Sequence, residues 1–76
     1  MTPPAGPELE SIAAGLSELS ERLAEVALDL LRSATRAGEP QERDAAAALE
    51  RRVTRARRAV DKAAGLLAHE PEVDPA

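Results

Sequence analysis

Cysteine and aromatic residues are both missing from this chain of 76 residues. Without cysteine, no disulfide can reinforce a core that, at this length, supplies only about 3–5 kcal/mol. Without Phe, Tyr or Trp, the core must be thin and built from Leu, Ile, Val and Ala, which suits packed helices better than a sheet. Since a structural metal is not expected either, self-association is the simplest source of the missing stability.

Long apolar runs and a strong excess of one charge are also lacking. Nothing approaches the roughly 18 apolar residues of a membrane span, and residues 1–7 have neither the basic nor the apolar region of a secretion signal. The net charge is −4, and the acids of segment 70–76 account for most of it. We therefore expect a soluble, cytoplasmic protein whose overall charge favours neither nucleic acid nor a membrane.

Two heptad patterns of apolar residues dominate what is present. Spacings of three and four alternate without interruption in each pattern, which is typical of helices that pack as a coiled coil. The first pattern predicts a helix over about 7–37, which Pro7 can open because its missing N–H needs no partner there. Its seam is Leu9, Ile12, Leu16, Leu19, Leu23, Val26 and Leu30. The second predicts a helix over about 40–69. Its seam is Ala46, Leu49, Val53, Ala56, Val60, Ala63 and Leu67.

The break between the two helices is short, at residues 38–40. Gly38 can take the left-handed conformation that ends many helices, and Pro40 can open the next one. Helices joined by short links become antiparallel neighbours. The fold class is therefore all-α, an antiparallel two-helix hairpin with coiled-coil heptad packing over 7–69 that dimerises into a four-helix bundle. We expect disorder in segment 1–6 and a flexible acidic tail over 70–76.

This plan resembles the small helical hairpins of bacterial type VII secretion in outline. The chain lacks the Trp-x-Gly turn of that family and its C-terminal Tyr. The resemblance is therefore confined to the fold and implies nothing about function here.

Two glycines, Gly15 and Gly65, interrupt the predicted helices at roughly opposite levels near the open end of the hairpin. They mark either a close approach of the two backbones or a weak end that frays. The residues alone do not decide between these interpretations.

Helix faces near the turn carry more apolar surface than one seam uses. We predict a partner interface there, most simply with a second copy of the chain. We call these residues the loop-end patch: Ala24, Leu28, Leu31, Ala34, Ala45 and Ala48.

The second predicted helix also carries a basic stripe, which we define as Arg51, Arg55, Arg58 and Lys62. Such a stripe could contact the phosphates of a nucleic acid. Alternatively, it could form ion pairs with the first helix, whose residues 15–26 lie opposite and include Glu18, Glu21 and Glu25. The matching positions of acids and bases favour the second interpretation.

No pattern predicts catalysis, a metal or a cofactor. The one histidine, His69, has no glutamate three residues before it, as a di-iron helix bundle would require, and no nucleophile stands beside a base. We expect a non-enzymatic module that binds proteins through its helix faces: a small assembly, adaptor or regulatory subunit. The alternative is a nucleic-acid-binding protein that uses the basic stripe.

Overall fold

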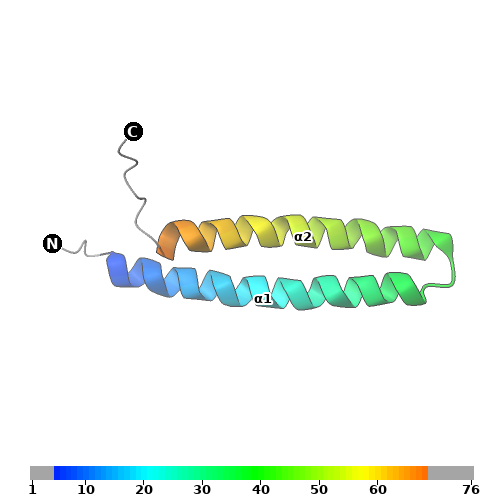
Figure 1. The fold of residues 1–76 in the computed structure, drawn as a ribbon, viewed down its shortest axis with the longest axis horizontal. Helices are drawn as coiled ribbons and strands as arrows, with labels where there is room; N and C mark the ends of the chain where they lie inside the picture. Colours follow the sequence, from blue (N-terminus) through cyan, green and yellow to red (C-terminus); the bar gives the residue numbers. More distant parts are fainter. Residues whose placement is uncertain (1–4, 69–76) are drawn as a thin grey trace, which may run out of the picture.

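The computed structural model describes residues 5–68, which form two long helices lying side by side (Figure 1). Helix α1 spans Gly6–Arg36 and helix α2 spans Pro40–Ala68. They run in opposite directions, joined by a turn at one end (Figure 1). The prediction of an all-helical hairpin is therefore confirmed. Residues 1–4 and 69–76, which include most of the N-terminal segment, His69 and the acidic tail, lie outside the described residues.

The first turn of helix α1 contains a proline and an acidic residue, both of which favour a helix start at this point. Ala5 is the N-cap, and its carbonyl accepts a hydrogen bond of 2.9 Å from the N–H of Leu9. Pro7 occupies the first turn, where its missing N–H leaves no gap in the hydrogen bonding. Glu8 lies in the same turn, where the helix dipole favours a negative charge.

The end of α1 differs from the prediction made for Gly38. Neither Gly38 nor any other described glycine has a positive φ, so the left-handed cap is wrong. The helix ends instead at Arg36, and its C-cap is Ala37, whose backbone is extended (φ −62°, ψ 128°) and whose N–H donates to the carbonyl of Ser33 at 2.9 Å. Pro40 then opens α2, as predicted, because its fixed φ suits a first helical position.

The contact between the helices is made largely of small side chains. Ala13 and Ser20 of α1 are each 4% exposed and Ala64 of α2 is 7% exposed, while no large side chain of the described residues is fully buried. The Cα radius of gyration is 17.4 Å, against about 11 Å for a compact chain of this length. The hairpin is thus a single layer of helix without a thick core.

The predicted seam of α1 is only half correct. Leu16, Leu23 and Leu30 are half-buried between the helices, and the small residues at 13, 20 and 27 complete the contact with them. Ile12, Leu19 and Val26, expected in the same seam, are 50%, 46% and 45% exposed. Helix α1 is therefore turned by about one residue from the predicted orientation, because its small side chains allow the closer approach.

Helix α2 is turned in the same sense. Five residues of its predicted seam are half-buried, namely Ala46, Val53, Val60, Ala63 and Leu67, whereas Leu49 is 43% exposed and Ala56 is also exposed. The strongest apolar line of each helix is thus only partly used by the hairpin.

The structure contradicts one of the two interpretations of the helical glycines, the close approach of the backbones. A Cβ placed on Gly15 or Gly65 would meet no heavy atom within 4 Å. The two backbones therefore do not approach each other closely at these positions within the hairpin.

Candidate protein-binding surfaces

The apolar residues left out of the hairpin contact form one surface that spans both helices, which we call the open face. A shallow groove on it is lined by Leu23 of α1 together with Leu49, Arg52, Val53, Arg55 and Ala56 of α2. Since Leu19 and Val26 stand one helical turn on either side of Leu23, their exposed side chains flank the α1 side of this groove. The open face consists of Leu9, Ile12, Leu19 and Val26 from α1 and Leu49 and Ala56 from α2.

Basic side chains border the open face along α2. Arg52 and Arg55 line the same groove as Leu49 and Ala56, so the basic stripe adjoins the open face through Arg55. By helical spacing, Arg22 and Asp29 border the exposed apolar residues of α1. The open face is therefore an apolar strip with charged side chains along its edges.

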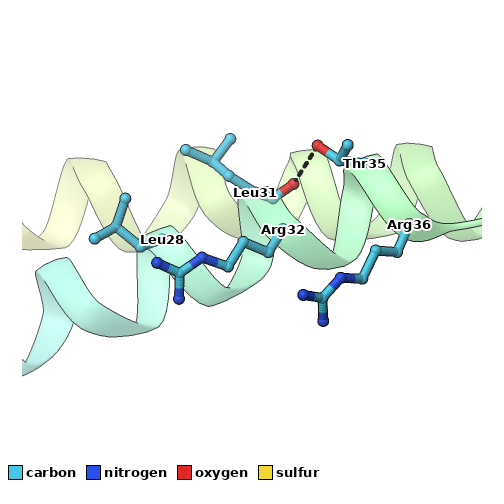
Figure 2. Close-up of a pocket in the computed structure, with 5 residues that line it drawn as sticks. All are labelled: Leu28, Leu31, Arg32, Thr35 and Arg36. Atoms are coloured by element: carbon cyan, nitrogen blue, oxygen red, sulfur yellow. Dashed lines mark hydrogen bonds between the residues drawn. The ribbon is translucent and has the colours of Figure 1, made fainter.

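The structure brings Leu28 and Leu31 of the loop-end patch together on α1. They are 51% and 47% exposed, and they line a shallow groove with Arg32, Thr35 and Arg36. Figure 2 shows both leucines pointing to the same side of the helix, with the two guanidinium groups below them. An ion pair of 3.4 Å joins Arg32 to Asp29 at the edge of this groove.

The remaining residues of the loop-end patch are dispersed. Ala24 and Ala34 are half-buried toward α2, and Ala45 and Ala48 are exposed on α2. The groove at Leu28 is lined from α1 alone and does not include either alanine of α2. The patch therefore remains a prediction, and its large side chains belong to one helix.

A polar contact that the sequence analysis missed crosses between the helices. The hydroxyl of Ser20, buried in the small-residue seam, donates to the carboxylate of Asp61, which also lies 4.0 Å from the guanidinium of Arg57. A buried hydroxyl held by a carboxylate at the edge of the seam fixes the register of two helices, because any slip would leave the hydroxyl without a partner. The available signal was a serine at heptad spacing between Ala13 and Ala27.

The basic stripe is exposed along α2. Arg51, Arg55 and Arg58 line a shallow groove together with Glu50 and Thr54, whose side chains are joined by a hydrogen bond of 2.6 Å from the Thr54 hydroxyl. Over residues 5–68, both ion pairs lie within a single helix. The expected pairing of the stripe with Glu18, Glu21 and Glu25 is therefore not formed in the hairpin.

Other kinds of site find no support in the described part of the chain. Residues 5–68 contain no group of three or more His, Cys, Asp or Glu side chains that could hold a metal ion. Neither α1 nor α2 has the length of apolar sequence that crossing a bilayer requires. Compared with family models, with curated proteins and with solved structures, the chain finds no match. The case for function rests on the exposed surfaces themselves.

Proposed function

We propose that this protein is a non-enzymatic, cytoplasmic protein–protein interaction module: a small assembly, adaptor or regulatory subunit that acts through its helix faces. Its most direct form is a homodimer in which two hairpins make a four-helix bundle, and a helical partner protein is the other form. The observation that carries the proposal is the exposure of large apolar side chains. They are Leu9, Ile12, Leu19, Val26, Leu28, Leu31, Leu49 and Leu66, all at least 39% exposed.

The surface area of the chain supports this proposal. The chain exposes 6291 Å². A stable interface buries about 800 Å² on each partner. The single layer thus has ample surface to cover, and a contiguous apolar face is typical of an interaction site.

A photo-crosslinking experiment in the cells of origin tests this function. A photoreactive residue replaces Leu19 in one variant and Leu28 in another, and a third variant carries it at Arg58, an exposed, charged control that lies outside the open-face groove. The proposal predicts discrete cross-linked protein species from at least one apolar position that are missing from the Arg58 variant. If neither apolar position cross-links above the control, the chain does not act through these faces.

One observation favours a second candidate, a nucleic-acid-binding protein. The basic stripe is exposed and lines a groove, and the described residues show no ion pair from it to α1. The absence of aromatic residues excludes base-stacking platforms, so such binding would go through phosphates. Four phosphate contacts on duplex DNA would lower affinity about 100-fold between 50 and 200 mM salt.

Fluorescence anisotropy with a labelled DNA duplex and a labelled RNA tests the second candidate. Arg51→Ala with Arg58→Ala should weaken binding and reduce its salt dependence, whereas the matched pair Arg32→Ala with Arg36→Ala on α1 should change little. Failure to bind either probe at low salt would remove this candidate.

A further inference from the structure

We infer that the groove of the open face binds an acidic amphipathic helix of a partner protein, which lies between α1 and α2 and completes a three-helix bundle. This inference rests on the proposed function and specifies its second form, the helical partner protein. It adds the surface that is used, the charge of the partner and the side chains that recognise that charge. A homodimer formed through the loop-end patch is compatible with it.

The exposed apolar residues of the open face have the period that one further helix requires. Leu19 and Val26 of α1 are 46% and 45% exposed and stand seven residues apart, and Leu49 and Ala56 of α2 are exposed with the same interval. Seven residues are two helical turns, or about 10.5 Å. The two helices lie side by side (Figure 1), and Leu23 lines one groove together with Leu49 and Ala56. A helix whose apolar residues repeat at this interval can therefore contact both helices every second turn.

The charged residues that line this groove are both basic. Arg52 and Arg55 of α2 are exposed there, and none of the described acidic residues shares the lining. Neither arginine takes part in an ion pair between residues 5 and 68, where the two pairs that form use Arg32 and Arg57. Two guanidinium groups thus stand beside an apolar floor, and carboxylates are suited to pair with them because one carboxylate accepts two parallel N–H bonds from a guanidinium.

The α1 side of the open face carries charge of the same sign. By helical spacing Arg22 borders both Leu19 and Val26, which are three and four residues away. Asp29 borders Val26 as well, but its carboxylate already lies 3.4 Å from the guanidinium of Arg32. A helix with acidic side chains along both edges of its apolar stripe therefore meets arginines on both sides of the groove. Such complementarity favours this partner over others of the same shape.

The same charges disfavour other occupants of the groove. In a two-fold dimer through this face each surface contacts its own copy, which brings Arg52 and Arg55 of both chains into one interface, where like charges repel. A nucleic acid would set its phosphates against exposed leucine and valine side chains. An anionic membrane would repel a chain of net charge −4, which has no aromatic residue to anchor it at the lipid interface. An acidic amphipathic helix suits both the floor of the groove and its edges.

Fluorescence anisotropy with labelled peptides of designed sequence tests the inference on the full chain. The acidic probe is a helix of about three heptads with leucines at heptad spacing and glutamates beside them. The basic probe has lysine in place of every glutamate, and the scrambled probe keeps the acidic composition but has no apolar stripe. The chain should bind the acidic probe at least about tenfold more tightly than either of the others. Equal binding of the acidic and scrambled probes would show attraction by charge alone and would overturn the inference.

Reversal of charge on the protein tests where the acidic probe binds. Arg52→Glu with Arg55→Glu should weaken its binding at least about tenfold and should allow the basic probe to bind. Arg51→Glu with Arg58→Glu is the matched control, since it makes the same change of charge on the same helix outside this groove. All four side chains are exposed, and circular dichroism checks that both variants stay helical. Equal losses from the two variants would overturn the groove as the binding site.

A pair of leucine substitutions tests the apolar floor of the groove. Leu49→Ala removes an exposed side chain that lines the groove, so it should weaken binding of the acidic probe at least about fivefold. Leu66→Ala makes the same change on the same helix outside the groove, at a side chain that is 65% exposed, and should leave binding unchanged. An equal effect of the two substitutions would contradict contact with the floor.

The cross-linking experiment in cells separates this inference from the proposed function. The photoreactive residue at position 19 should link to a segment with heptad-spaced apolar residues and flanking acids, identified by mass spectrometry of the joined peptides. A link from position 19 to a second copy, or to a segment without this pattern, would overturn the inference and leave the proposed function standing. No link from position 19 or 28 above the control would remove both. Binding to vesicles of equal parts phosphatidylglycerol and phosphatidylcholine, lost with Arg52→Glu and Arg55→Glu, would assign the face to a membrane and would also overturn the inference.

Discussion

Replacing both helical glycines with alanine should stabilise the protein. Gly15 lies in the interior of α1 and Gly65 lies near the end of α2, and an added Cβ meets nothing within 4 Å at either site. Alanine is favoured over glycine inside a helix by about 0.8–1.0 kcal/mol, because glycine loses more backbone freedom on folding. With no steric cost to subtract, the double variant should gain nearly 2 kcal/mol, somewhat less if the last turn of α2 frays.

This gain should be visible as a higher melting temperature. For a domain of this size, 1 kcal/mol corresponds to about 4–8 °C, so the double variant should melt roughly 10 °C higher by far-ultraviolet circular dichroism. All proteins must be compared at one concentration, because the stability of a dimer depends on it. Ala14→Gly, an exposed change beside Gly15, is the matched control and should cost about 1 kcal/mol.

A loss of stability with Gly15→Ala would refute this reasoning. It would mean that some backbone approaches Gly15 closely, and since the hairpin offers none, that backbone would belong to another molecule. A gain with Gly15→Ala together with no change for Gly65→Ala would instead mean that the end of α2 is frayed before the substitution.

Three further predictions follow from contacts within and outside the hairpin. Asp61→Ala should cost about 1–3 kcal/mol in the free energy of unfolding, because it leaves the buried Ser20 hydroxyl without its partner. Ser20→Ala should cost less, because the exposed carboxylate of Asp61 then forms hydrogen bonds with water. Urea unfolding measures both free energies, and equal costs would contradict the idea that this contact fixes the register of the helices. Gly38→Ala should be neutral or stabilising by up to about 1 kcal/mol in the same assay, since its φ is not positive, whereas a left-handed cap would make it destabilising. Finally, the homodimer that we propose should persist at high salt in light scattering, because its contacts would be apolar side chains such as Leu28 and Leu31; dissociation by salt would point to ion pairs as its main contact.

Most of the fold could be predicted from the sequence because its signals are local. Alternating spacings of three and four residues identify a helix without knowledge of its neighbours. Pro7 and Pro40 each fix φ near the helical value, so each helix start can be predicted from a single residue without knowledge of the rest of the fold. The end of α1 was placed nearly correctly for the wrong reason, since an extended Ala37 ends a helix as effectively as a left-handed glycine.

The orientation of the helices about their own axes could not be predicted in the same way. Leu16 and Leu23 fit a seam that continues through Leu19 or one that continues through Ser20, because both have heptad spacing. Hydrophobicity favours the first, whereas the structure uses the second, since side chains as small as those of Ala13 and Ser20 bring two helices closer. When a chain has enough apolar residues for two packing surfaces, the sequence alone does not show which surface each residue belongs to.

The small-residue seam imposes a one-sided constraint on how this protein can change. Almost every substitution open to Ala13 or Ala64 adds atoms, and each added atom pushes the helix axes apart along much of their length. An ordinary leucine-filled core loses stability chiefly when its side chains shrink, whereas this seam loses it when they grow. At the three buried positions, Ala13, Ser20 and Ala64, variation is therefore restricted to residues no larger than serine, and the freedom to vary in size lies with side chains outside this seam.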